Sequence, residues 1–241
     1  MNEENINLIN LLGKDAIIKN VNNTETTNVM CGEFTYNNTI IITYIIGDNL
    51  SNNTRVFTGK IVGLIEINDN NEKRFVVSDS ELYGSYAAVK GALRNIVELK
   101  NAKLKCLNEK SAGVVIYQMK NGEPYYLVTY SKKNFAGFPK GHVEYGETDE
   151  SAAIREAKEE AGVDVKLKSN FQSSINYMVY DAPTRKEVVF FLAEIEENEN
   201  INIDTKEINK YEIVNYKQSS AILNEELMNV LTEAKKYIEN N

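Results

Sequence analysis

Three glutamates, Glu156, Glu159 and Glu160, occupy positions i, i+3 and i+4 of a stretch whose composition favours a helix. On a helix these positions are neighbours, with Cβ atoms roughly 5–6 Å apart. Like charges this close destabilise an isolated helix, so we expect a cation to lie against them. Carboxylate oxygens are hard ligands, which suit Mg²⁺ or Mn²⁺ better than Zn²⁺. The alternative, for the three glutamates taken alone, is an acidic helix face that is simply solvated.

Local signals mark both ends of this helix. Thr148 is suited to cap its start, and Gly162 stands where a helix commonly ends in a left-handed residue. Small apolar side chains recur on one face, which we expect to pack against a sheet. That face is formed by Ala153, Ala157 and Ala161, with Ile154 beside them. Arg155 can reach the glutamates, or a carbonyl of the preceding loop, with its rigid fork of donors.

The whole stretch, residues 141–163, resembles the Nudix box. Every spacing of that pattern is kept, and the matching positions are Gly141, Glu147, Arg155, Glu156, Ala157, Glu159, Glu160, Gly162 and Val163. The resemblance implies an α/β/α sandwich around the box, and hydrolysis of a nucleoside diphosphate linked to another group. It also implies that Glu156, Glu159 and Glu160 hold Mg²⁺ or Mn²⁺. One of them, or a carboxylate further along the chain, would take the proton of the attacking water.

The same resemblance implies roles for the neighbouring positions of the box. Arg155 would orient the glutamates, and Glu147 would support the geometry of the loop. Gly141 would let the backbone approach the metal or the phosphate, and its carbonyl oxygen is a candidate further ligand.

The residues just before the box bear on the substrate. The run 139–144 is similar to the equivalent run of diadenosine tetraphosphate hydrolases. That resemblance implies that Lys140 and His142 contact phosphates; the alternative for both is a solvent-exposed loop. Tyr180 stands at the distance beyond the box where a tyrosine often accompanies dinucleoside polyphosphate activity in this family. Its ring can stack on adenine, although a tyrosine in a strand often packs against its neighbours instead.

We therefore expect a Mg²⁺-dependent pyrophosphohydrolase whose substrate is a dinucleoside polyphosphate such as diadenosine tetraphosphate. Other substrates stay open: ADP-ribose or a nucleotide sugar, an oxidised nucleotide, or a diphosphoinositol polyphosphate. A rival of another class is a non-catalytic module that binds a nucleotide as a sensor. The complete set of glutamates favours the enzyme.

The composition narrows the range of partners. The chain of 241 residues carries a net charge of −8, which argues against a general nucleic-acid surface or an anionic membrane as partner. No apolar run approaches the length of a membrane span, and from the acidic start we expect no signal peptide. The two cysteines, Cys31 and Cys106, have no metal-type spacing and favour a reduced compartment. We expect a cytoplasmic protein that binds a small nucleotide.

The first part of the chain reads as a β-rich, barrel-like domain over residues 1–105. Alternating runs predict strands at 39–46, 56–67 and 74–78, with a turn at 68–71, and helical spacing predicts a helix over 85–100. Residues 59–79 weakly resemble part of the barrel of inorganic pyrophosphatases, without the acidic motif of those enzymes. We expect this domain to be non-catalytic. It is either a packing or homodimerisation module or a wall of the substrate pocket.

The second part, residues 110–241, is the expected Nudix domain, after a polar linker at 101–110. Apolar runs predict strands at 112–118, 125–130, 165–167, 173–180, 187–195 and 212–216, and a closing helix over 219–240. The fold class is therefore α+β, with a C-terminal α/β/α sandwich that contains a mixed sheet.

Overall fold

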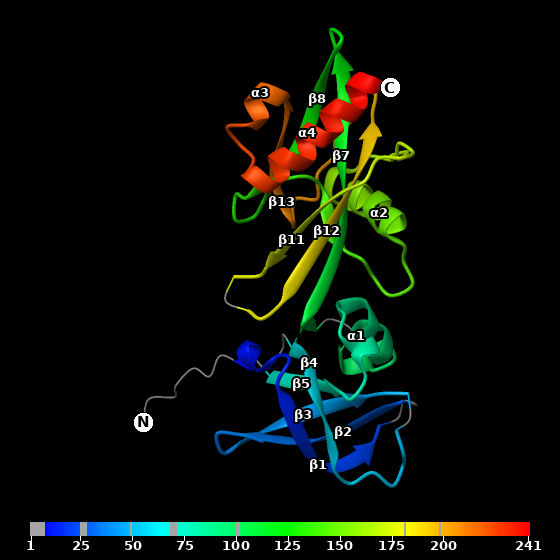
Figure 1. The fold of residues 1–241 in the computed structure, drawn as a ribbon, viewed down its shortest axis with the longest axis vertical. Helices are drawn as coiled ribbons and strands as arrows, with labels where there is room; N and C mark the ends of the chain where they lie inside the picture. The colour runs from blue at the N-terminus through cyan, green and yellow to red at the C-terminus, as the bar shows by residue number, and fades with distance from the viewer. Residues whose placement is uncertain are drawn as a thin grey trace. The chain divides into compact units, whose positions relative to one another are not determined.

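The computed structural model describes residues 8–24, 28–48, 50–67, 72–99, 102–180, 182–197 and 199–241 (Figure 1). The expected turn at 68–71 lies outside these residues. The chain forms two compact units. Unit 1 comprises Met1–Glu109, Glu144–Gly146 and Tyr177–Lys186, and unit 2 comprises Lys110–Val143, Glu147–Asn176 and Glu187–Asn241.

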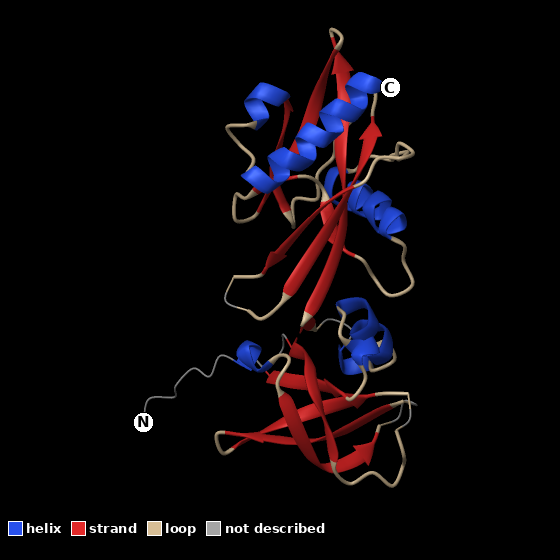
Figure 2. Cartoon of the chain, in the orientation of Figure 1, coloured by secondary structure: helices blue, strands red, loops and turns tan. Residues whose placement is uncertain are grey.

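Unit 1 is built on a barrel of β-strands, drawn in red in Figure 2. The strands are β1 (Asp15–Asn23), β2 (Val29–Tyr36), β3 (Thr39–Ile46), β4 (Phe57–Ile67), β5 (Glu72–Ser78) and β6 (Lys103–Cys106). They are ordered β1-β2-β3-β5-β4-β6, and β1 also pairs with β4. This extra pairing closes the sheet into a barrel, because β1, the first strand of the order, then lies beside β4, the fifth. The barrel-like character expected from the sequence is confirmed.

One short helix, α1 (Tyr86–Leu93), packs on the outside of the barrel. Its buried Val89 and Leu93 join a cluster with Val62 and Val76 of the strands. The helix expected over 85–100 was too long: it ends at Leu93, and Val97–Leu99 form a 3₁₀ turn. Further 3₁₀ turns span Leu8–Leu11 and Glu81–Tyr83.

The stretch 101–110, expected as a polar linker, contains strands and ends at the boundary between the two units, which lies between Glu109 and Lys110. Lys103–Cys106 form β6, which pairs with β4 in antiparallel orientation, and Asn108 begins β7. The backbone of Lys103–Cys106 is thus paired with β4, which the polar side chains of this strand alone could not indicate.

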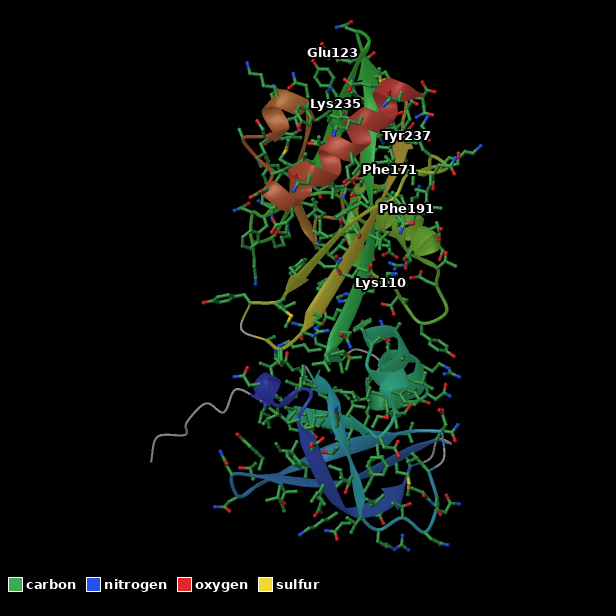
Figure 3. All side chains as sticks on the ribbon, viewed as in Figure 1. Lys110, Glu123, Phe171, Phe191, Lys235 and Tyr237 are labelled. Atoms are coloured by element: carbon green, nitrogen blue, oxygen red, sulfur yellow. The ribbon has the colours of Figure 1, made fainter. Side chains whose placement is uncertain are left out.

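The sheet of unit 2 is ordered β11-β12-β7-β8-β13, with β10 on β7 and β9 on β8. The strands are β7 (Asn108–Lys120), β8 (Glu123–Ser131), β9 (Ala136–Gly137), β10 (Lys140–His142), β11 (Ser173–Met178), β12 (Arg185–Glu194) and β13 (Ile208–Asn215). The helices are α2 (Asp149–Ala161), α3 (Tyr216–Ser219) and α4 (Glu225–Asn240). At the start of β7, Lys110 (labelled in Figure 3) forms an ion pair of 2.7 Å with Asp149 in the first turn of α2.

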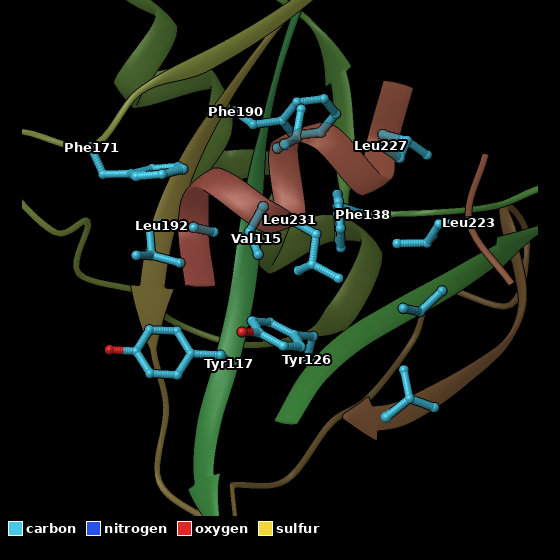
Figure 4. Close-up of a cluster of buried hydrophobic side chains, with 14 of the residues drawn as sticks. Val115, Tyr117, Tyr126, Phe138, Phe171, Phe190, Leu192, Leu223, Leu227 and Leu231 are labelled. Carbon is cyan, nitrogen blue, oxygen red and sulfur yellow. The ribbon is translucent and has the colours of Figure 1, made fainter. Parts of the chain in front are cut away.

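Successive side chains of a strand point to opposite faces, so each central strand covers two cores. In β7, Val114 and Ile116 lie in the cluster with the alanines of α2, whereas Val115 and Tyr117 lie in the cluster with α4. Figure 4 shows the α4 side, where Leu231 lies among the side chains of the sheet. Helices therefore cover both faces, and the predicted α/β/α sandwich is confirmed.

Some element boundaries differ from those expected. The helix over 219–240 is interrupted, because the side chain of Asn224 accepts from the backbone N–H of Leu227 and starts α4 afresh. The strand expected at 165–167 is only an isolated bridge at Leu167. The strand at 173–180 ends at Met178, and the one at 212–216 starts earlier, at Ile208. No helix in the described ranges combines the length and apolar composition that a bilayer crossing requires.

Candidate active site

Helix α2 begins and ends where its sequence predicts. The side chain of Thr148 accepts from the N–H of Ser151 and completes a capping box with it, and Gly162 ends the helix with φ 74°. Ala153, Ala157 and Ala161 are buried against the sheet as expected. Ile154 is not part of this face and is 40% exposed, because it lies one position round the helix from the alanines.

Glu156 is buried on the inner side of α2. Only 7% of the residue is exposed, and its carboxylate lies directly against the backbone of Gly141 in β10. A Cβ atom at position 141 would overlap that carboxylate, so glycine is required for this approach. Burial raises the pKa of Glu156, and the negative charges of Glu159 and Glu207 act in the same direction.

Glu160 lies further along the same side of the helix, and its carboxylate accepts from the backbone N–H of Lys140 at 2.9 Å. Burial raises the pKa of Glu160 to about 7, and the charges of Glu156 and Glu207 add to the effect. The charge of Lys140 opposes it. A carboxylate in this position is poorly solvated when ionised, and it gains from any positive charge brought to it.

Glu159 differs from the other two helix glutamates. Its side chain is 58% exposed, and its carboxylate accepts from Nη1 of Arg155 at 2.9 Å. The structure thus buries Glu156 and partly buries Glu160, while Glu159 lies exposed at the rim.

Arg155 connects the helix to the loop before it. Its Nε and Nη2 bind the two carboxylate oxygens of Glu147 at 2.7 and 2.9 Å, and Nη2 also donates to the carbonyl of His142 at 2.9 Å. Its Nη1 donates to Glu156 at 2.6 Å as well as to Glu159. The hydrogen bond to Glu147, followed by those to Glu156 and Glu159, keeps the pKa of the guanidinium above its usual value. Arg155 therefore binds both the glutamates of the helix and a carbonyl of the preceding loop, which were the two alternatives expected from the sequence.

The other predicted positions fall into two groups. Lys140, Gly141 and His142 form β10 in unit 2, where they pair with β7 beside the glutamates. Tyr180 belongs to unit 1 and is 90% exposed, so it is not packed among strand neighbours.

Sequence reasoning missed Glu207, whose charge raises the pKa values of both Glu156 and Glu160. Its segment is tied to the end of α2, because the N–H groups of Asn202 and Asp204 donate to the carbonyls of Ala161 and Glu160 at 2.9 and 3.3 Å. No local signal marks Glu207, since it stands in an acidic, Asn-rich stretch of similar residues.

These carboxylates fit a divalent cation of the Mg²⁺ type. Their donors are all hard oxygens, Glu156 is buried and Glu160 is partly buried, and both have raised pKa values. The backbone of Gly141 lies directly against the carboxylate of Glu156. Within the described ranges, no three His, Cys, Asp or Glu side chains already converge as a finished metal site. Arg155 instead holds Glu156 and Glu159, and a cation would compete with it for their oxygens.

Parts of this chain are similar to known proteins. An asymmetrical bis(5′-nucleosyl)-tetraphosphatase of Sus scrofa is 42% identical over 62 residues, which are 24% of this chain and 41% of that protein. The chain thus spans about two fifths of the length of that relative. An RNA pyrophosphohydrolase of Campylobacter jejuni subsp. doylei is 30% identical over 119 residues, which are 44% of this chain and 74% of that protein.

A solved Caenorhabditis elegans Ap4A hydrolase in a binary complex is similar in fold, with a TM-score of 0.52 and 24% identity. The match covers 55% of this chain and 99% of that one. A family model described as the NUDIX domain matches residues 107–233, which include β10, α2 and Glu207. With that match over more than half of its length, the chain belongs to the Nudix hydrolase family.

Proposed function

We propose that the protein hydrolyses a pyrophosphate bond in a nucleoside diphosphate derivative, with Mg²⁺ or Mn²⁺ as cofactor. The observation that carries the proposal is the pair Glu156 and Glu160, one buried and one partly buried, whose pKa values are both raised beside Glu207. Carboxylates whose pKa values are raised by burial and by neighbouring negative charges are costly in a merely structural role. A site that must bind a cation and an anionic polyphosphate accounts for them.

In this proposal Glu156, Glu159 and Glu160 hold the cation, which neutralises phosphate charge and acidifies a water molecule when bound. Arg155 keeps the glutamates in position through its bonds to Glu147 and the carbonyl of His142. The backbone at Gly141 approaches the cation or the phosphate. Glu207, which is exposed and close to Glu156 and Glu160, is the carboxylate assigned to accept the proton of the attacking water.

A dinucleoside polyphosphate, such as diadenosine tetraphosphate, is the proposed substrate. The pig relative is a bis(5′-nucleosyl)-tetraphosphatase, and Lys140 of the same β10 strand brings a positive charge near Glu160. Lys140 and His142 are the proposed phosphate contacts of this substrate.

The 5′-triphosphate end of an RNA is a second candidate, because the relative whose match covers 74% of its length is an RNA pyrophosphohydrolase. The net charge of −8 favours the small nucleotide, since RNA binding gains most of its strength from positive side chains. With few cysteines and no expected membrane or nucleic-acid partner, we propose a cytoplasmic enzyme of small nucleotides.

The test is a substrate panel with Mg²⁺: diadenosine tetraphosphate, a 5′-triphosphorylated RNA oligonucleotide, ADP-ribose and an oxidised nucleoside triphosphate. The wild type is compared with Glu160→Gln, Glu207→Gln and the control Glu150→Gln, whose exposed side chain lies in the first turn of the same helix. We expect turnover of diadenosine tetraphosphate to fall about 10²- to 10⁴-fold in the first two variants and to persist in the control.

Two outcomes contradict the proposal. Equal turnover by the wild type and Glu160→Gln would remove the assigned role of these carboxylates. Tight binding of a nucleotide by the wild type, without hydrolysis of any member of the panel, would favour a sensor.

A further inference from the structure

The segment Glu144–Gly146 separates the two groups that Arg155 binds outside α2. The carbonyl oxygen of His142, just before the segment, accepts from Nη2 at 2.9 Å. The carboxylate of Glu147, just after it, binds Nε at 2.7 Å. The segment itself belongs to unit 1, the unit that contains α1. Helix α1 makes two contacts with this segment.

The first contact is an ion pair. Nζ of Lys90 in α1 lies 2.6 Å from Oε1 of Glu144, and it also donates to the hydroxyl of Tyr86 at 3.1 Å. The two charged side chains are 46% and 35% exposed, so the pair is not deeply buried. An exposed pair contributes little to global stability, but it still selects one position for a short loop.

The second contact seats the ring of Tyr145 on the helix. A Cβ atom at Gly91 would overlap this ring, so the ring can approach only because position 91 is glycine. The guanidinium carbon of Arg94 lies 5.1 Å from the ring centroid, a cation–π distance, and Nη1 of Arg94 is fixed by the carbonyl of Gly91 at 2.6 Å.

A glycine in a helix lowers helix stability relative to alanine. Gly91 therefore lowers the stability of α1, but it leaves the space in which the ring of Tyr145 packs on the helix. Adjacent residues of one helix thus hold both Glu144 and Tyr145, while Gly146, with φ 85°, turns the chain toward Glu147.

We propose that α1 positions the loop of the Nudix box, with Lys90 and Gly91 as the positioning residues. The loop then presents the carbonyl of His142 and the carboxylate of Glu147 to Arg155, which in turn orients Glu156 and Glu159. The inference rests on the proposed function, because the loop affects turnover only if these glutamates take part in it. It gives α1 a positioning role that neither packing nor dimerisation would supply.

The test compares full-length variants by two measurements. Amide hydrogen exchange of residues 141–148 reports the loop without reference to activity, and steady-state kinetics report kcat and KM. Lys90→Glu places two negative side chains together, and Lys90→Glu with Glu144→Lys restores an opposite pair. The matched control is Lys105→Glu, which reverses a 41% exposed lysine of the same unit that binds Glu66 at 3.0 Å.

For Lys90→Glu we expect exchange in the loop to rise about tenfold and kcat to fall about tenfold, with KM changed less than about twofold. The charge-swapped pair should recover most of both losses. Gly91→Ala should expel the exposed Tyr145 ring and lower kcat, while thermal stability is unchanged or raised by the better helix former. A purely structural role would instead lower stability and activity together.

The outcomes separate this inference from the proposed function. If the wild type turns over substrate, and Lys90→Glu and Gly91→Ala match it in both exchange and kcat, the positioning role is overturned while the activity stands. If the wild type turns over nothing, the activity fails, and unchanged exchange in Lys90→Glu would overturn the positioning of the loop as well. Loss of protection in Lys90→Glu but not in Lys105→Glu supports it in either case.

Discussion

Arg155 binds Glu147 with two parallel hydrogen bonds, Nε to Oε1 at 2.7 Å and Nη2 to Oε2 at 2.9 Å. The planar fork of arginine matches the two oxygens of a carboxylate, whereas lysine offers a single point charge. The same guanidinium has donors left for the carbonyl of His142 and for Glu156. One side chain thus fixes both the loop and the helix of the site.

The first prediction follows from this geometry. Arg155→Lys keeps the charge and loses the fork, so kcat should fall at least about tenfold while KM changes less. The free energy of unfolding should fall by only about 1 kcal/mol, because these ion pairs are partly exposed. Kinetics and urea denaturation measure the two effects, with exposed Arg55→Lys as the control. Full activity in Arg155→Lys would show that charge alone suffices.

The second prediction concerns the approach of Glu156 to Gly141. Gly141→Ala should displace the Glu156 carboxylate, because the added methyl group would occupy its position. We expect turnover to fall about 10²-fold or more, and the Mg²⁺ concentration for half-maximal rate to rise. The control is Gly137→Ala in neighbouring β9, where the nearest atom, Cδ1 of Leu227, is 3.8 Å from the added Cβ. Unaltered Mg²⁺ dependence in Gly141→Ala would argue against cation binding by Glu156.

The third prediction is a pH dependence of stability in the metal-free protein. The folded-state pKa of Glu160 is raised from 4.5 to about 7, mainly by burial. Between these values the folded state binds more protons than the unfolded state, so the free energy of unfolding falls as pH rises. The loss attributable to Glu160 is up to about 3 kcal/mol.

Denaturation of the wild type and of Glu160→Gln at pH 5.5 and 7.5 in EDTA measures this loss of stability. The variant is the reference, because a neutral glutamine does not titrate. Mg²⁺ at pH 7.5 should restore stability to the wild type, since it binds only the folded arrangement of carboxylates. A wild type that gains stability relative to Glu160→Gln on going from pH 5.5 to 7.5 would contradict the prediction.

The fourth prediction concerns the core beside α4. Tyr126 is fully buried, and its hydroxyl has no hydrogen-bond partner among the described residues. Burial raises the pKa of this hydroxyl, which therefore stays neutral. Tyr126→Phe removes an unpaired polar group and should raise the free energy of unfolding by about 1 kcal/mol.

The matched variant is Tyr237→Phe, which removes a hydroxyl that donates to the carbonyl of Ser169 at 2.6 Å. It should lower the free energy of unfolding by about 1 kcal/mol. Urea denaturation of both variants checks the pair. Destabilisation by Tyr126→Phe would mean that its hydroxyl finds a partner in solution.

Much of the site could be predicted from the sequence because it depends on local geometry. The spacing of Glu156, Glu159 and Glu160 fixes them near one another on any α-helix, and Thr148 and Gly162 act on backbone groups within a turn of themselves. Runs of apolar residues likewise predicted most of the strands that form the two cores of the sandwich.

The remaining features were decided by tertiary structure. They include the burial of Glu156, the position of Glu207 near Glu156 and Glu160, the pairing of β1 with β4, and the ion pair between Lys90 of α1 and Glu144. Each of these depends on contacts between residues that are distant along the chain. Such contacts depend on how the whole chain closes and packs, and no local propensity encodes them. The sequence by itself therefore determined the helix and its charges, whereas only the folded chain decided which of those charges lie away from water.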